Sequence, residues 1–264
     1  MKKLKLTLVT LLAIFFAGCY EVNEEIVINE NGSGTYVTKM DMSQLLEMLQ
    51  TMGGEEELTK EGLDRAIDTT ILMGSLMDSA KDVTADQKEL LKDGKLQVQM
   101  NMKEKLMKLN VNLPFTSYGN LQKLMSGVGN SGTGIGEAFK SMFDKGGDSS
   151  SAGDSPAQPQ PKSNQLDQLN GVFDVTAKNG MLSRKANKEK LKALMEKPEM
   201  VQMKQLSSSG MEILYTTTIK FPRPVKKSDN ALIKLSDDKK TATMKYNLLE
   251  MMETPEKFSY TIEY

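Results

Sequence analysis

Two neighbouring runs of strictly alternating apolar and polar residues constrain the fold of this chain more than any other feature. The run KLQVQMNM, residues 95–102, places Leu96, Val98, Met100 and Met102 on one face of a strand, and LMKLNVNLPF, residues 106–115, alternates in the same way. Only a strand has a side-chain period of two residues, so a helix would scatter these side chains around its axis. Residues 95–115 therefore predict an antiparallel hairpin that is covered on one face.

Other segments predict hairpins through their turns. Residues 20–29 and 34–40 flank the turn ENGSG, and VFDVTA and MLSRK flank the turn KNG. Asn-Gly between two apolar runs is a strong hairpin signal, because both residues tolerate the positive φ of a tight turn. Further strands are expected at residues 211–221, 231–235, 241–248 and 258–264.

Helices are expected between these hairpins. Asp41 or Ser43 can cap a helix that ends near residue 52, and Thr84-Ala85-Asp86-Gln87 forms a capping box for another. Further helices are expected at residues 63–80, 118–126, 188–197, 198–206 and 249–253, with Asn187 as a cap. Hairpins interrupted by helices predict an α+β fold with a largely antiparallel sheet packed with helices.

The composition of residues 127–164 divides the chain. Residues 127–136 are rich in Gly, and residues 144–164 consist mostly of Gly, Ser, Asp, Pro and Gln, with almost nothing to bury. We therefore expect an N-terminal lobe at 19–126, a flexible linker at 127–164 and a C-terminal lobe at 165–264. Whether the two lobes share one sheet stays open.

An apolar helix face interrupts the linker at residues 135–143. Ile135, Phe139, Met142 and Phe143 recur at helical spacing in GIGEAFKSMFDK. Such a face can dock on a membrane or a partner protein. It can also pack on the protein's own core, which is the commoner use of an apolar helix face.

The first twenty residues resemble the leader of a bacterial lipoprotein. Three lysines precede an apolar run at residues 6–17, which is too short to span a membrane comfortably. Phe16-Ala17-Gly18-Cys19 resembles the lipobox of that family, although Phe16 stands where an aliphatic residue is usual. The resemblance implies a signal peptide at 1–18, a lipid on Cys19 and acylation of the new amino group. Cys19 would then bind the membrane and take no part in catalysis or in a disulfide.

The residues after Cys19 indicate which membrane the protein is expected to occupy. In the lipoproteins of Gram-negative bacteria, Asp after the cysteine often retains the protein in the inner membrane, so Tyr20 favours the outer membrane. Glu21, Glu24 and Glu25 could form an acidic signal for display on the cell surface. They also fall on an expected strand, and a solvated strand face is the interpretation that we prefer.

The composition of the chain excludes several classes of function. Without its first 18 residues the chain has 31 basic residues in place of 34, against 35 acidic ones, and it has neither His nor Trp. That balance disfavours nucleic-acid binding. Without His, and with Cys19 lipidated, Ser-His, Cys-His and zinc-type sites are excluded. We expect no enzyme, no metal and no cofactor. The 20 methionines could suggest Cu(I), but Met100 and Met102 share a face with Leu96, which indicates core packing.

Two stretches are similar to envelope lipoproteins with an LppM-like domain. They are INENGSGTYVTKMDMS near the start and IKFPRPVKKSDNALIKLSDDKKTATM near the end, about a fifth of the chain. The resemblance implies an α+β fold, and a lipid-binding role has been proposed for that domain type. The long linker and the many methionines depart from the pattern, and no site residues are carried over.

These observations predict a lipid-anchored envelope protein with a non-enzymatic binding or scaffolding role. One version has an apolar groove that takes a lipid or another apolar ligand. A second recruits an envelope protein through the face of Ile135, Phe139, Met142 and Phe143. A hydrolase built on carboxylates or a Ser-Lys pair is the third and least favoured alternative.

Overall fold

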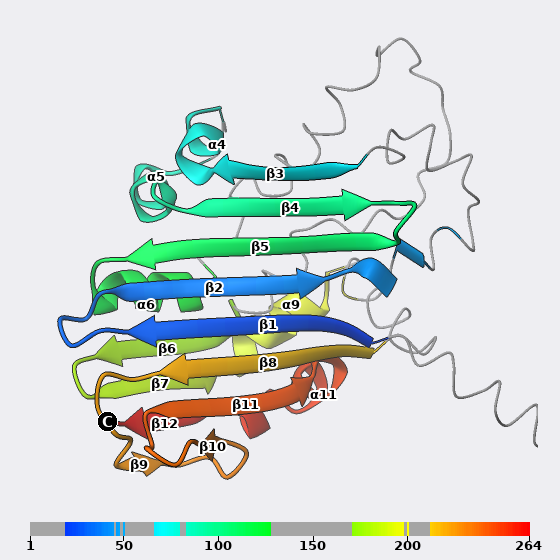
Figure 1. Cartoon of the computed structure of the whole chain (residues 1–264). Coiled ribbons are helices and arrows are strands. Elements are labelled where there is room, and N and C mark those ends of the chain that lie inside the picture. Colours follow the sequence, from blue (N-terminus) through cyan, green and yellow to red (C-terminus); the bar gives the residue numbers. More distant parts are fainter. Residues whose placement is uncertain are drawn as a thin grey trace, which may run out of the picture.

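A computed structural model describes residues 19–44, 46–47, 50, 66–79, 83–127, 171–197, 200 and 212–264. These residues form two β-sheets with helices packed around them (Figure 1). The predicted α+β class with a largely antiparallel sheet is confirmed. The expected signal peptide at 1–18, the apolar face at 135–143 and most of the helix expected at 198–206 lie outside the described residues.

The larger sheet has eight strands in the order β10-β11-β8-β1-β2-β5-β4-β3. Its strands are β1 (Cys19–Ile28), β2 (Gly34–Asp41), β3 (Ile67–Leu72), β4 (Lys95–Asn101), β5 (Leu106–Phe115), β8 (Glu212–Lys220), β10 (Lys234–Leu235) and β11 (Thr241–Asn247). All neighbouring strands run antiparallel except β1 and β8, which are parallel. Because β1 precedes the expected linker and β8 follows it, the two expected lobes share this sheet.

The smaller sheet lies behind the larger one in Figure 1 and has the order β6-β7-β12-β9. Its strands are β6 (Phe173–Lys178), β7 (Met181–Ala186), β9 (Lys227–Ser228) and β12 (Tyr260–Glu263). The helices are α4 (Met73–Ser79), α5 (Ala85–Leu91), α6 (Tyr118–Met125), α9 (Lys188–Met195) and α11 (Leu248–Glu253), followed by the short 3-10 helix η2 (Pro255–Phe258). Residues from both sheets and from the helices form one continuous core.

The local signals explain why these elements form. In β4, Leu96, Val98 and Met100 are buried, so the predicted hairpin with one covered face is confirmed. In the first hairpin, Gly32 has a φ of +81°, a conformation that glycine adopts without strain. The Thr84 hydroxyl accepts a hydrogen bond from the Gln87 amide, which confirms the predicted capping box.

Two predictions of secondary structure are wrong in part. Residues 63–80 were expected to be helical, but the described part is strand β3 followed by α4. The run Ile67-Asp-Thr-Thr-Ile71 is rich in β-branched residues, and its pairing with β4 outweighs the helical spacing. The strand expected at 231–235 is reduced to β10, and the unexpected two-residue strand β9 forms at Lys227–Ser228 instead.

Candidate functional site

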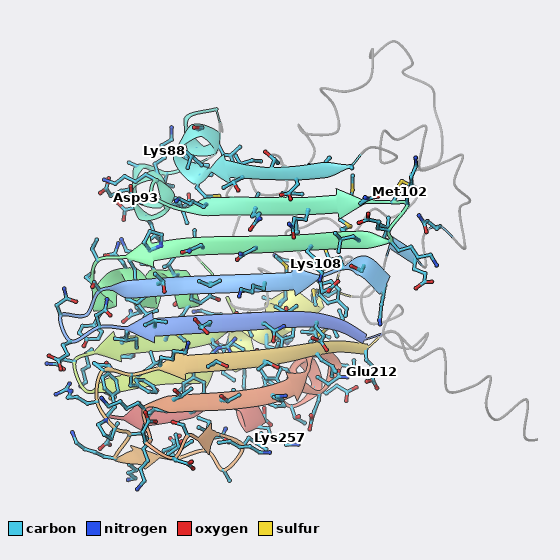
Figure 2. All side chains as sticks on the ribbon, in the orientation of Figure 1. Lys88, Asp93, Met102, Lys108, Glu212 and Lys257 are labelled. Atoms are coloured by element: carbon cyan, nitrogen blue, oxygen red, sulfur yellow. The ribbon has the colours of Figure 1, made fainter. Side chains whose placement is uncertain are left out.

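The expected lipidation site lies at the first residue of β1. Cys19 pairs in register with Glu212 of β8, so the chain belongs to the sheet from Cys19 onward. β1 is an interior strand, with β8 on one side and β2 on the other. Figure 2 shows Met102, Lys108 and Glu212 near the same end of the larger sheet. A lipid on Cys19 would therefore hold this end of the sheet, which we call the anchor end, beside the membrane without a stalk.

Ion pairs and local hydrogen bonds order the anchor end. The Lys108 ammonium lies 3.3 Å from an Asp41 oxygen, and Lys105 forms a second ion pair with Glu47 at 2.5 Å. Burial alone would raise the pKa of Asp41. Hydrogen bonds from Ser43 and the charge of Lys108 outweigh burial and hold that pKa below its usual value. Because both ion pairs are half exposed, each stabilises the fold only slightly.

A second candidate site is a polar cluster buried between the two sheets. Its members come from six strands, and we call it the interlayer polar cluster: Glu24, Tyr36, Arg184, Thr217, Tyr246 and Tyr260. Glu24 is only 5% exposed, and its two carboxylate oxygens accept hydrogen bonds from the Tyr36 hydroxyl at 2.7 Å and the Thr217 hydroxyl at 3.0 Å. The expectation that Glu24 lies on a solvated strand face is therefore wrong, although Glu21 is exposed and Glu25 half-buried.

Arg184 supplies the positive charge of the cluster from the smaller sheet. It is 3% exposed, and its guanidinium carbon lies 3.8 Å from the centre of the Phe173 ring. Burial would lower the pKa of Arg184, but Tyr246, Glu24 and Tyr260 outweigh burial and raise it. Arg184 therefore stays charged, and the cluster couples a positive charge on the smaller sheet to the Glu24 carboxylate on the larger one.

The tyrosines of the cluster stay protonated at neutral pH. Burial is the main cause that raises the pKa of Tyr36, Tyr246 and Tyr260, and the Glu24 carboxylate adds to the effect in each. A protonated hydroxyl can donate a hydrogen bond, as Tyr36 does to Glu24. Each member of the cluster is buried, so its chemistry is suited to holding two layers together and not to acting on a substrate from solvent.

A small cavity lies beside this cluster. Its volume is about 10 Å³, close to the minimum that one water molecule requires. Both layers and the loop before β10 line it, through Thr217, Ile219, Ile233, Ala242, Thr243, Met244, Tyr260 and Ile262. Pockets for small organic ligands measure roughly 300–1,000 Å³. This cavity is therefore too small for an apolar ligand, which would have to bind elsewhere.

The structure tests some of the other candidates from the sequence and leaves the rest untested. Ile135, Phe139, Met142 and Phe143 lie outside the described residues, so their role as a contact face stays a prediction. Met100 and Met102 are both buried, as expected of core residues. Within the described ranges, no group of three or more Asp, Glu or Cys side chains could hold a metal ion. The same residues include no helix that is long and apolar enough to cross a membrane.

The comparisons with known proteins found no match to this chain. No family model, no curated protein and no solved structure matches the chain. The resemblances to lipoprotein leaders and to LppM-like domains therefore stay expectations from the sequence.

Proposed function

We propose that this protein is a lipid-anchored protein of the cell envelope with a non-enzymatic binding or scaffolding role. The observation that carries the proposal is the position of Cys19. The cysteine of the lipobox-like stretch is also the first residue of the interior strand β1, so this strand begins where the leader would be cut. Tyr20 in the second position of the processed chain favours the outer membrane.

The packing of the sheets favours a binding surface outside the core. The interlayer cavity has room for about one water molecule, and the interlayer polar cluster beside it is sealed from solvent. The outward face of the larger sheet, by contrast, presents polar side chains such as Asn23, Lys39 and Thr216. The apolar-ligand version and the version based on residues 135–143 both stay predictions for the remaining chain.

The proposal is tested by metabolic labelling of the full chain in a bacterial host that processes lipoproteins. Cells receive an alkynyl fatty acid, and the protein is probed for the label and fractionated with the membranes. We expect the wild-type chain to carry the label and to sediment with membranes, and Cys19→Ala to lose both properties. Phe16→Leu is the matched control, because it restores the usual aliphatic residue and should leave labelling intact.

Two results would overturn the proposal. The first is a wild-type chain without the label in a host that labels its own lipoproteins. The second is Cys19→Ala that still carries the label or still resists extraction from membranes by alkaline carbonate. Mass spectrometry of the N-terminal peptide adds an independent criterion, since cleavage anywhere but before Cys19 contradicts a lipoprotein leader.

A further inference from the structure

The two sheets have four edge strands, and three of them are protected against pairing with another chain. β9 and β10 have two residues each, and each contains a lysine. Short and charged edges are the usual protection against strand addition. β6 is covered by α6, from which the Gln122 side chain accepts a hydrogen bond from the Ala177 amide. A backbone donor of this edge strand is therefore already occupied.

Among the described residues, the fourth edge, β3, is the least protected, because it is longer than β9 and β10 and Asp68 is its single charged residue. Its six residues, Ile67–Leu72, contain no Lys, Arg or Pro, and no described strand pairs with the side opposite β4. Leu72 is 55% exposed, which makes it the most exposed of the large apolar residues that the structure describes. On the face turned toward the core, Ile67 and Ile71 are only half-buried. An added strand would cover part of Ile67 and Ile71 and would pair with the backbone groups on this edge that no described strand satisfies.

We propose that β3 pairs with β3 of a second copy of this chain, antiparallel, about a two-fold axis at Thr69. In this register Ile67 of one copy lies opposite Ile71 of the other, twice by symmetry, and Asp68 lies opposite Thr70. Facing residues belong to the same face of the sheet, so the apolar side stays continuous across the contact.

The neighbouring registers are worse. An axis at Asp68 would place two carboxylates directly opposite each other, which is destabilising. An axis at Thr70 would oppose Asp68 to the apolar side chain of Leu72. The residues of the edge strand thus favour Thr69 as the centre over either alternative.

Symmetry and size set what this pairing can do. A two-fold axis perpendicular to the sheet keeps the covered face of both copies on one side and closes the assembly as a dimer. Six residues of strand span only about 20 Å. A contact of that size buries less than the roughly 1,000 Å² expected of a stable interface. We therefore expect weak association in dilute solution and more dimer when copies are concentrated, as on a surface.

Cysteine cross-linking in the full chain tests the contact and its register. Thr69→Cys places two thiols across the axis, with Cα atoms about 5 Å apart, within the range of a disulfide. Thr70→Cys is the matched control. Its thiols would lie two residues apart along the strands, with Cα atoms about 8 Å apart, too far for a disulfide. Under mild oxidation in membranes we expect a covalent dimer with Thr69→Cys and little with Thr70→Cys.

A second pair of variants adjusts the charges beside the axis. Asp68 and Thr70 are both exposed, so substitution of Thr70 should not affect the fold. In the Thr69→Cys chain, Thr70→Asp would oppose two carboxylate pairs, and Thr70→Lys would create two opposite-charge pairs. We expect the rate of dimer formation to fall about five-fold with Thr70→Asp and to rise with Thr70→Lys.

The outcomes separate this proposal from the lipid anchor. Equal cross-linking at positions 69 and 70, no cross-linking at 69 in a chain that melts like wild type, or no response to charge would overturn the pairing. The wild-type chain, with Cys19 as its single cysteine, is oxidised in parallel. A dimer in that sample would show a free thiol at Cys19 and would contradict the proposed lipidation, not the pairing of β3.

Discussion

Removing the positive charge of the interlayer polar cluster should destabilise the fold strongly. In Arg184→Met the side chain keeps a similar length and can still cover the Phe173 ring, but it carries no charge. Glu24 would then remain between the sheets, 5% exposed and without the charge of Arg184, while the hydrogen bonds from Tyr36 and Thr217 to its carboxylate stay in place. A buried charge that loses its counter-charge is one of the most destabilising changes a core can suffer.

The size of the effect follows from the burial of both partners. Leaving a buried charge without its counter-charge costs about 3–5 kcal/mol. For a domain of this size each kcal/mol lowers Tm by about 2–4 °C, so we expect a fall on the order of 10 °C. The complementary change, Glu24→Gln, should also destabilise the fold, because it leaves the buried Arg184 guanidinium without its counter-charge, although the amide oxygen can still accept the hydrogen bond from Tyr36.

Urea unfolding followed by circular dichroism measures the four members of a double-mutant cycle. We expect the chain with both Glu24→Gln and Arg184→Met to be more stable than the sum of the single changes implies, by about 1–3 kcal/mol. Strictly additive changes would show that Glu24 and Arg184 do not interact. A cost below about 1 kcal/mol for Arg184→Met alone would refute the reasoning that Arg184 compensates the buried charge of Glu24.

Three further predictions concern pH and backbone packing. The buried tyrosines of the interlayer polar cluster have folded-state pKa values above those of the unfolded chain, so stability should fall as pH rises above about 10; absorbance at 295 nm should show them ionising only as the chain unfolds. Asp229 accepts a hydrogen bond from the Thr261 amide and pairs with Lys185 at 2.7 Å. Burial raises the pKa of Asp229, but these partners outweigh burial and lower it. The contribution of Asp229 to the stability of the fold is thus present above about pH 4 and is lost as pH falls through its folded-state pKa. When the stability of Asp229→Asn is measured as a function of pH, it should lack that part of the loss. Gly34→Ala would place its Cβ 1.8 Å from the Val27 carbonyl oxygen, whereas Gly119→Ala would meet nothing closer than 3.8 Å; thermal melts should show a loss of about 3 kcal/mol or more for the first and no loss for the second.

Much of the fold could be predicted because its local signals agree with its long-range pairing. The alternating runs at 95–115, the Asn-Gly turns and the Thr84 capping box each formed the structure that they predict. The parallel pairing of β1 with β8 joins residues about 190 positions apart. No local pattern carries that information, because it depends on which strand has the complementary apolar face. The strand β3 was missed because β-branched residues there also fit a helical spacing.

The interlayer polar cluster was missed although a signal was present. Tyr20, Val22, Ile26 and Ile28 occupy the even positions of β1 and are buried, and Glu24 stands in the same series. The alternation alone therefore placed this carboxylate in the core. Its partner could not be named in advance, because Arg184 lies on the other sheet and 160 residues away. A charged residue at a position where the alternation predicts a buried apolar side chain indicates a buried polar contact, even when the sequence does not identify the partner.

The position of Cys19 at the start of an interior strand also determines how the molecule responds to force. A pull on Cys19 along the axis of β1 loads the hydrogen bonds to β2 and β8 in shear, so that many bonds must break together. A strand attached at a sheet edge, or pulled across the sheet, would instead be peeled away one bond at a time. Resistance to such a pull is governed by the rate of unfolding and not by the equilibrium stability. The same fold could therefore be only moderately stable in solution and still remain intact when tension is applied through Cys19.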